Sequence, residues 1–420
     1  MFKVKRYIKR HFYYPYLFFK HNQYAKTLKK KKEIKVVFFA MNVAMWKYQH
    51  LYELMVKNPR FKIYIVLSPA NTYTKEQIWE DIKAMRNYFS IHKTSYIDWK
   101  IEEGEAPLDV RKAINPDILF YSQPYKNAVT YMHQYIWFKD KLICYYPYGY
   151  IITDAPWTCN LEFHHLLWKF FVYNKYTYNY VKHTMSSHYD NLVILGYPSV
   201  DDFFVEHDND VWKNDERGIK RIIWAPHFTI RDSIKGFAPR SNFLWMADMM
   251  VDIARKNIGK IQLAFKPHPR LRSELYNTES WGVTKTDAYY KQWESMPNTQ
   301  LETGDFVNLF RGSDAMIHDS GSFVVDYAHF YEKPVMFMSQ DINIPISEVN
   351  QIGKDIYKSC YWGKNEEDIQ HFIQDIVIGG EDTKKVERER VFHDYLEPQS
   401  DMTVAERAYN NIIQSLEING

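Results

Sequence analysis

Two proline-flanked peptides carry histidines and basic residues in a spacing that suits phosphate binding. One reads Lys266-Pro267-His268-Pro269-Arg270 and places three groups that can be cationic within five residues. Such groups repel one another unless an anion lies between them, and the prolines fix the backbone that carries them. The other reads Pro226-His227-Phe228-Thr229-Ile230-Arg231 and offers an imidazole and a guanidinium for phosphoryl oxygens. Ordinary solvated loops are the alternative for both peptides.

A third peptide, His318-Asp319-Ser320-Gly321-Ser322, has the composition of a helix start that binds anions. Small hydroxyl residues and a glycine leave backbone N–H groups exposed there, and the helix dipole attracts phosphate to them. Simple helix capping by Ser320 or Ser322 is the alternative, and both roles can coexist. We therefore predict one pyrophosphate-binding set from the three peptides: Arg231, Lys266, His268, Arg270, Asp319, Ser320, Gly321 and Ser322.

Other nucleotide and metal motifs are absent from the sequence. It has no Walker loop, and no GxGxxG follows the first predicted strand, which disfavours a nicotinamide site. No Asp-X-Asp stands where a metal-dependent glycosyltransferase needs one. The three cysteines are too far apart for a zinc site or a disulfide framework. We therefore expect no metal and no cofactor, and we interpret His164-His165 as helix packing and Asp201-Asp202 as a helix cap.

Short apolar runs separated by helical stretches must position these peptides. The predicted strands cover residues 34–42, 61–68, 117–122, 141–146, 170–173 and 192–195 in the first half, and 221–225, 262–266, 298–302, 315–318 and 335–338 in the second. The predicted helices include 45–57, 242–256, 305–311 with Asp305 as its cap, 322–330 and 403–416. Apolar strands that alternate with helices form parallel sheets covered on both faces. Ligands of such sheets bind beyond the carboxyl ends of the strands, where all three peptides fall.

Two such sheets predict an α/β protein of GT-B type, with two Rossmann-like domains facing a cleft. We expect residues 34–205 to form the acceptor domain and residues 219–398 the nucleotide-donor domain. The polar, acidic stretch 206–218 is the predicted linker. The last segment, 399–420, is expected to pack back towards the first domain through its helix.

The first 33 residues form a basic and aromatic segment of their own. Residues 1–35 hold twelve Lys or Arg and one acid, Glu33, whereas the whole chain has a net charge of only +3. Pro15 and the lack of a small-residue cleavage site argue against a signal peptide, and no run approaches ~18 apolar residues. A segment of this kind can lie on an anionic membrane surface, where each basic residue adds about 1 kcal/mol. A solvated arm is the alternative, and we expect no nucleic-acid partner because nothing downstream resembles a nucleic-acid fold.

Four stretches, in their order along the chain, resemble the CDP-glycerol glycerophosphotransferase family of teichoic-acid primases and polymerases. They are ILGYPSVDDFF at 194–204, IIWAPHFTIRD at 222–232, FKPHPRL at 265–271 and MIHDSGSFVVDYAHFYEKPVMFM at 316–338. The resemblance implies that His268, Ser320 and Ser322 bind the donor pyrophosphate, with Arg231 and Lys266 assisting. It also implies attack by an acceptor hydroxyl on the β-phosphorus of CDP-glycerol or a related CDP-alditol, with release of CMP.

The same resemblance implies a partner and a location. Enzymes of this family use polyprenyl-linked or polymer acceptors, so we expect attachment to the cytoplasmic face of the cell membrane through residues 1–33.

One part of the family pattern is missing. A Trp-His-Gly, whose histidine looks like the general base, corresponds here to Tyr146-Pro147-Tyr148-Gly149-Tyr150, so the glycine is kept and the histidine is not. A tyrosine with an ordinary pKa near 10 is a poor base at neutral pH. We therefore name His227, Asp154 and Tyr148 as candidate catalytic residues.

Other functions remain open at this point. A capsule or surface-polysaccharide glycosyltransferase that uses a CMP-, CDP- or UDP-sugar is the main alternative. A non-catalytic binding module and a sugar epimerase are the others.

Overall fold

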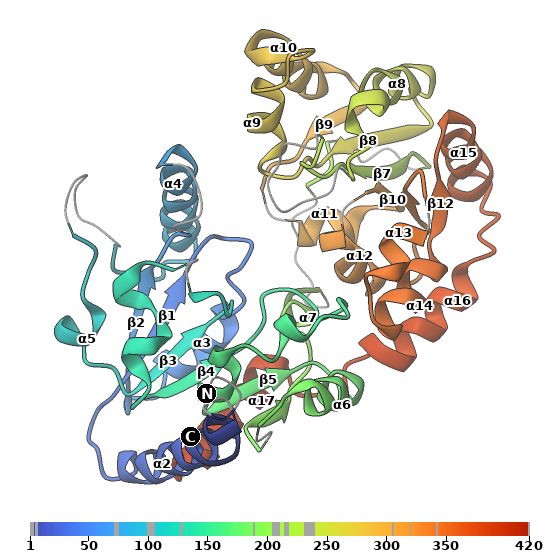
Figure 1. The fold of residues 1–420 in the computed structure, drawn as a ribbon. Helices are drawn as coiled ribbons and strands as arrows, with labels where there is room; N and C mark the ends of the chain where they lie inside the picture. The colour runs from blue at the N-terminus through green and yellow to red at the C-terminus, as the bar shows by residue number, and fades with distance from the viewer. Residues whose placement is uncertain are drawn as a thin grey trace. The chain divides into compact units, whose positions relative to one another are not determined.

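The computed structural model describes residue 4 and residues 7–70, 75–98, 106–126, 129–187, 190–203, 211–213, 218–230, 240–304, 306–319, 321–341 and 343–418. The chain divides into two compact units. The first unit comprises Met1–Asp201 and Pro398–Gly420, and the second comprises Asp202–Glu397. Figure 1 shows a parallel sheet flanked by helices in each of them. Each unit is described by itself below.

The first unit is built on a six-stranded parallel sheet with the order β2-β1-β3-β4-β5-β6. Its strands are β1 (Ile34–Ala40), β2 (Phe61–Leu67), β3 (Ile118–Tyr121), β4 (Leu142–Tyr145), β5 (Lys169–Val172) and β6 (Leu192–Ile194). β1 reads IKVVFFA and is buried along almost its whole length, as expected of a strand covered on both faces. Its helices are α2 (Tyr14–Leu28), α3 (Gln49–Val56), α4 (Lys75–Ile91), α5 (Val110–Ala113), α6 (Lys175–Thr184) and α17 (Val404–Leu416).

The basic N-terminal segment is a packed helix over much of its length. α2 continues the π-helical turn η1 (Lys9–Tyr13) and buries Tyr14, His21, Ala25 and Leu28 on one stripe. The helix is tied to β3 because the hydroxyl of Tyr24 donates to Asp117, 2.6 Å away. Residues 14–28 are therefore not a free solvated arm. None of the helices in the described part of the chain combines the length and apolar character needed to cross a bilayer.

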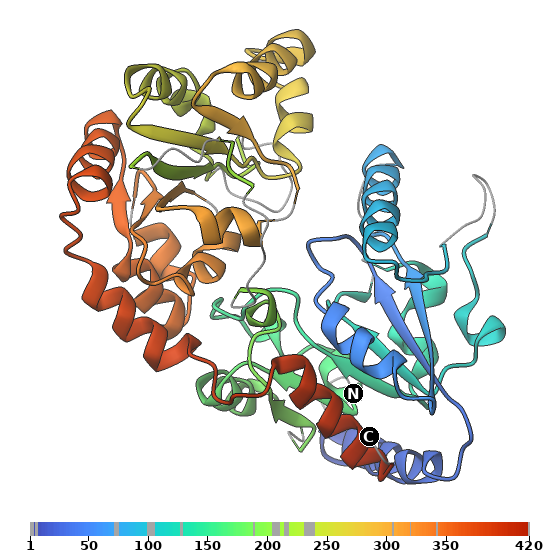
Figure 2. The same ribbon diagram turned by 180° about the vertical axis from the view of Figure 1, so that it is seen from behind.

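The C-terminal helix α17 belongs to the first unit and lies alongside α2 and α3 (Figure 2). Its first turn is capped by Asp201, whose carboxylate accepts from the backbone N–H groups of Val404 and Ala405 at 2.7 and 2.8 Å. Asp201 is thus a helix cap, as the sequence suggested, but the helix that it caps lies some 200 residues further along the chain. The short helix α7 (Val200–Phe203) contains the point where the chain leaves the first unit.

The second unit is also built on a six-stranded parallel sheet, with the order β12-β11-β10-β7-β8-β9. Its strands are β7 (Lys220–Ala225), β8 (Ile261–Phe265), β9 (Thr299–Leu301), β10 (Ala315–His318), β11 (Val335–Met338) and β12 (Tyr361–Gly363). Its helices are α8 (Phe243–Lys256), α9 (Leu271–Tyr276), α10 (Gly282–Ser295), α11 (Val307–Gly312), α12 (Gly321–Ala328), α13 (Asn343–Ser347), α14 (Gln351–Ser359), α15 (Glu366–His371) and α16 (Lys385–Val391). The core beneath α8 holds Trp224, Phe243, Phe265 and Trp293, whose rings pack on one another.

The structure confirms the predicted parallel strands, with ends shifted by one or two residues. The helix predicted from residue 45 begins at Gln49, because Asn42 accepts from the backbone N–H of Met45 and forms a turn first. The strand β12 escaped prediction, since its three residues Tyr-Trp-Gly form no aliphatic run. His164 and His165 are buried in a 3-10 helix, η6 (Glu162–Leu166), which confirms their packing role. The proposed cap Asp305 lies outside the described residues.

Candidate functional site

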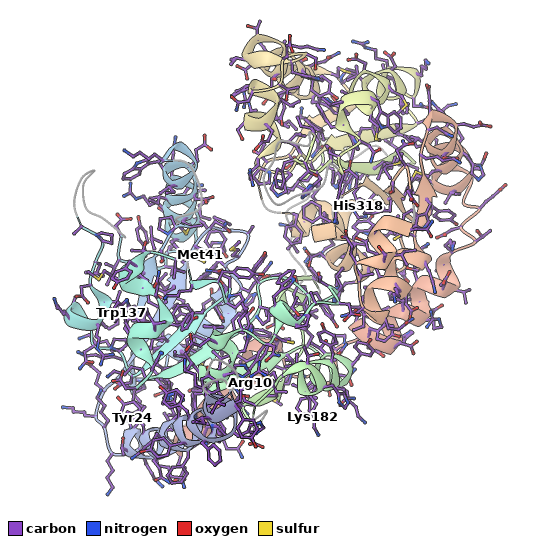
Figure 3. All side chains as sticks on the ribbon, viewed as in Figure 1. Arg10, Tyr24, Met41, Trp137, Lys182 and His318 are labelled. Atoms are coloured by element: carbon purple, nitrogen blue, oxygen red, sulfur yellow. The ribbon has the colours of Figure 1, made fainter. Side chains whose placement is uncertain are left out.

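The predicted donor-binding residues follow three adjacent strands of the second unit. β10, β7 and β8 are neighbours in the sheet, and the strand order changes direction between β10 and β7. Such a switch point is where open α/β sheets bind ligands, beyond the carboxyl ends of the strands. His318, labelled in Figure 3, marks this end of β10. We call the segments that follow β7, β8 and β10 the donor loops.

Asp319 ties two of the donor loops together. Its Oδ1 accepts from the backbone N–H of His227 at 2.6 Å, and its Oδ2 accepts from the backbone N–H of Asn242 at 2.5 Å. The residue is only 3% exposed, and burial raises the pKa of its carboxyl to about 6 although these hydrogen bonds act in the opposite direction. Both carboxylate oxygens are therefore engaged within the protein, and Asp319 fixes where the β7 loop begins and ends.

His227 and His268 form a pair at the centre of the donor loops. Their ring centroids lie 5.1 Å apart in an edge-to-face arrangement. The backbone joins the two loops as well, because the N–H of His268 donates to the carbonyl of Pro226 at 3.1 Å. Two residues from different strands are thus brought together as the sequence predicted, although it gave no indication of their relative orientation.

Both imidazoles have their Nδ1 atoms engaged within their own loops. The backbone N–H of Arg270 donates to Nδ1 of His268 at 3.1 Å, so a neutral ring carries its proton on Nε2. Nδ1 of His227 lies 2.9 Å from the hydroxyl of Thr229, whose oxygen in turn accepts from the backbone N–H of Arg240. The backbone N–H of Thr229 also donates to this Nδ1, at 3.4 Å, so Nδ1 is an acceptor, the hydroxyl donates to it, and Nε2 carries the proton on this ring too. Each histidine presents an Nε2–H donor.

Burial and nearby cations keep the histidine pair neutral. Burial lowers the pKa of His227 to about 4, and the charges of Arg240 and Arg270 act in the same direction. Burial also lowers the pKa of His268 well below its usual value, with His227, Arg270 and Lys266 contributing. At neutral pH the pair therefore acts through hydrogen bonds and not through positive charge.

Two cationic groups that follow β8, those of Lys266 and Arg270, are held by partners inside the second unit. The buried ammonium of Lys266 donates to the carbonyl of Gly304. Arg270 pairs with Glu274 at 3.1 Å and lies 4.2 Å from the centre of the Phe228 ring. Lys266 and Arg270 thus contribute positive potential from fixed positions beside the histidine pair.

The helix α12 begins directly after the β10 loop. Gly321 is its first residue and is exposed, and a Cβ atom at this position would lie 3.4 Å from the hydroxyl of Tyr357 on α14. The N-terminus of α12 therefore lies at the same sheet edge as the histidine pair. Ser320 and Arg231 lie outside the described residues, as does the side chain of Ser322.

The remaining catalytic candidates, Tyr148 and Asp154, belong to the first unit. Tyr148 follows β4, is 38% exposed, and its backbone N–H donates to the carbonyl of Ser122 at 3.0 Å. Its loop is held because the hydroxyl of Tyr173 donates to the carbonyl of Gly149 at 2.6 Å. Asp154 is exposed. The structure thus gathers His227, His268, Lys266, Arg270 and Asp319 at one edge, and places Tyr148 and Asp154 in a separate body.

Sequence reasoning missed three residues around the site: Arg240, Asn242 and Tyr357. Arg240 forms an ion pair with Glu348, and Asn242 donates to the carbonyl of Met338 at 3.1 Å. Only the position of Asn242 before an apolar-periodic helix gave a local signal. The other two reach the site through tertiary packing. Among the described residues, no group of three or more His, Cys, Asp or Glu is arranged to hold a metal ion.

Comparison with solved structures shows the same fold. The wall teichoic acid polymerase TagF matches with a TM-score of 0.60 at 13% identity, over 96% of this chain and 94% of that chain. A putative UDP-N-acetylglucosamine 2-epimerase from Listeria monocytogenes matches with a TM-score of 0.59 at 14% identity, over 92% and 97%. S. aureus MnaA with UDP matches with a TM-score of 0.53 at 14% identity, over 92% and 98%. These likenesses confirm the GT-B-like arrangement of two parallel-sheet α/β domains.

Comparison of sequences gives the family. A search of curated protein sequences found no match. The model of the CDP-glycerol:poly(glycerophosphate) glycerophosphotransferase family matches residues 160–414, which is more than half of the chain and includes all three donor loops. The match confirms the resemblance carried by the four motif stretches. This chain belongs to the CDP-glycerol:poly(glycerophosphate) glycerophosphotransferase family and is a transferase of that type.

Proposed function

We propose that this transferase moves glycerol phosphate from CDP-glycerol to a lipid-linked or polymer acceptor in the synthesis of a teichoic-acid-type polymer. The observation that carries the proposal is the meeting of the His227–His268 pair, Asp319, which binds the backbone of His227, and the start of α12 at the switch point of the second sheet. The family match supports the reaction. The fold shared with the teichoic acid polymerase agrees with the proposed pathway.

The donor pyrophosphate binds to neutral hydrogen-bond donors. The Nε2–H groups of His227 and His268 donate to phosphoryl oxygens, and the backbone at Gly321 adds the N–H groups and dipole of a helix start. Donors fixed before the reaction stabilise developing charge without having to reorganise. Ser320 and Ser322 complete this set in the proposal, and Arg231, Lys266 and Arg270 supply positive potential.

The reaction is an in-line displacement at the β-phosphorus of the donor. The oxygen of an acceptor hydroxyl forms the new bond, and the bond from the β-phosphorus to the bridging oxygen breaks. CMP leaves with the electron pair of that bond, and the hydroxyl proton passes to a base. The histidine pair stabilises the charge that builds on the phosphoryl oxygens as CMP departs.

The chemistry of the three candidate bases favours Asp154. His227 has its only unprotonated nitrogen turned to Thr229, which suits it to donate a hydrogen bond and not to accept a proton. Tyr148 must lose its phenolic proton before it can accept another one. An exposed carboxylate accepts a proton directly. We therefore assign the base to Asp154 and assign acceptor contacts to Tyr148.

A membrane surface is part of the proposal. Phe12, Tyr16 and Phe19 are exposed and follow one another at positions i, i+4 and i+7, so they share one face of η1 and α2. Exposed lysines flank them in the same segment. An apolar stripe beside basic residues suits attachment to anionic lipid on the cytoplasmic face of the membrane, where a polyprenyl-linked acceptor is presented.

The test is a product assay with the full chain, CDP-glycerol labelled in its glycerol and membranes that carry acceptor. We expect release of CMP together with a phosphodiester-linked product. His268→Ala should lower kcat/KM about 100-fold, as expected for the loss of one donor to developing charge. His371→Ala, at an exposed histidine of the same unit, serves as the control and should have no effect.

Other donors decide between the proposal and its alternatives. Turnover of a CMP-, CDP- or UDP-sugar to a glycosidic product, with CDP-glycerol inert, would establish a glycosyltransferase instead. Epimerisation of a UDP-sugar without transfer would establish an epimerase. Binding of CDP-glycerol without turnover in the presence of acceptor would indicate a binding module.

A further inference from the structure

A single aromatic ring, that of Phe228, lies against three side chains of the donor loops. Its centroid is 4.4 Å from the ring centroid of His227 and 4.4 Å from that of His268. The guanidinium of Arg270 lies 4.2 Å from the centre of the same ring. Phe228 is only 4% exposed, so its ring is packed inside the second unit and is not a surface contact.

These contacts join loops that are distant in sequence. His227 and Phe228 follow β7, whereas His268 and Arg270 follow β8. The backbone hydrogen bond from His268 to Pro226 sets the spacing of the two loops but does not fix how the imidazoles are turned. The ring of Phe228 restricts both imidazoles from one side, and the Nδ1 hydrogen bonds hold them within their own loops.

The chemistry of the ring suits this place. Histidines, an arginine and a lysine gather here, and their charged forms repel one another. The negative face of an aromatic ring attracts the Arg270 guanidinium, which lies over the Phe228 ring. The same ring excludes water from both histidines, which helps to keep them neutral.

We propose that Phe228 is a positioning residue that sets the orientation of both imidazoles for the donor pyrophosphate. The proposal rests on the function proposed above, because it assumes that the histidine pair binds the donor. Phe228 is apolar and would not itself bind phosphate. Its proposed role in donor affinity is exerted through the two imidazoles.

The first test replaces the ring by an aliphatic side chain in Phe228→Leu, with Phe228→Met as a second variant should the first fail to fold. We expect the Kd of CDP-glycerol, measured by calorimetry, to rise about tenfold, because ring packing and a cation–π contact are lost together. Phe228→Tyr keeps the ring and should bind CDP-glycerol within about twofold of the unchanged protein.

The second test follows the histidines directly, without any ligand, by NMR of their ring carbons as a function of pH. In Phe228→Leu we expect the titration midpoints of His227 and His268 to move upward, because water reaches the rings. The charged or titratable groups that face them are Arg240 and Arg270 for His227, and Arg270 and Lys266 for His268, besides each other. None of these groups is changed by the substitution.

Phe243→Leu is the matched control. Phe243 is fully buried in the same core and stacks on Trp224 with a centroid distance of 5.7 Å. It should lower the Tm but leave the Kd and both titration midpoints unchanged. A Phe228→Leu protein that behaves like this control would overturn the positioning role. If the unchanged protein does not bind CDP-glycerol, the proposed function fails, and the NMR titration still decides whether Phe228 governs the two imidazoles.

Discussion

Asp319 is the residue on which the geometry of the donor loops depends most directly. A carboxylate is needed there because two backbone N–H groups, of His227 and Asn242, must be satisfied at a buried position. A buried donor left without a partner costs about 1–3 kcal/mol. We therefore propose that Asp319 positions His227, although the sequence suggested that Asp319 contacts the donor directly.

We predict that Asp319→Asn lowers the free energy of unfolding by about 1–3 kcal/mol, because an amide offers one acceptor oxygen where two are used. The Kd of CDP-glycerol should rise at least tenfold, since the backbone of His227 loses its anchor. Urea unfolding and calorimetry measure the two effects.

Asp314→Asn is the control for this variant. Asp314 accepts from the backbone N–H of Arg221 at 2.8 Å, at the opposite end of the same pair of strands. This variant should lose stability and keep its donor affinity. Equal donor affinity in both variants would remove Asp319 from the site.

At the scale of elements, the helical segment formed by η1 and α2 has one buried face and one exposed face. One face packs on the first unit through Tyr14, His21, Ala25 and Leu28 of α2. The other face exposes Phe12 of η1, which is 64% accessible, and Phe19 of α2, which is 55% accessible. Exposed apolar side chains that gather on one face of a packed helix mark a candidate interaction surface. The proposed partner is an anionic membrane.

We predict that Phe12→Ser with Phe19→Ser weakens binding to vesicles with anionic lipid at least tenfold, because two apolar side chains no longer enter the interface. Co-sedimentation with phosphatidylglycerol vesicles measures the binding, which should also fall as salt is raised. Tyr131→Ser with Trp157→Ser removes two other exposed aromatics of the same unit and should have no effect. Equal binding by the two double variants would reject α2 as the attachment site.

The helices and strands show how much of the fold and the site could be predicted from the sequence. Strands such as β1 and β10 were predictable because a run of apolar residues fully buried in a parallel sheet has few other interpretations. That His227 and His268 lie at one edge was predictable, since parallel strands end at the same edge of a sheet. That their strands are neighbours was given by the structure alone. The partners of Asp319 and the ring contacts of Phe228 were not predictable, because they join loops whose spacing only the folded backbone sets.

At the scale of the whole molecule, the buried histidines of the described residues make stability depend on pH. Six histidines among the described residues have a pKa lowered by burial, namely His21, His133, His164, His227, His268 and His329. The unfolded chain takes up protons near pH 6.5, whereas the folded chain does so only near pH 4 for His133, His227 and His329. Their contribution to stability is therefore complete above pH 6.5 and is lost as the pH falls towards 4. The pKa values of Asp319 and Asp81 are raised to about 6 and about 7, so these two carboxyls favour the folded state as the pH falls. They are fewer than the histidines.

We predict that the free energy of unfolding falls between pH 7 and pH 5, by about 2 kcal/mol for each histidine whose pKa drops from 6.5 to about 4. Urea unfolding at pH 7, 6 and 5 measures the effect, and the slope gives the number of protons taken up on unfolding. Equal or higher stability at pH 5 would show that these rings are not neutral and buried in the native protein.

The central claim is that the donor loops of the second unit hold the pyrophosphate of CDP-glycerol. A crystal structure of the full chain with CDP-glycerol tests it most directly. We predict pyrophosphate oxygens within about 3.2 Å of Nε2 of both His227 and His268, at the N-terminus of α12. A donor bound with its phosphates away from the ends of β7, β8 and β10, and with neither imidazole in contact, would contradict the account.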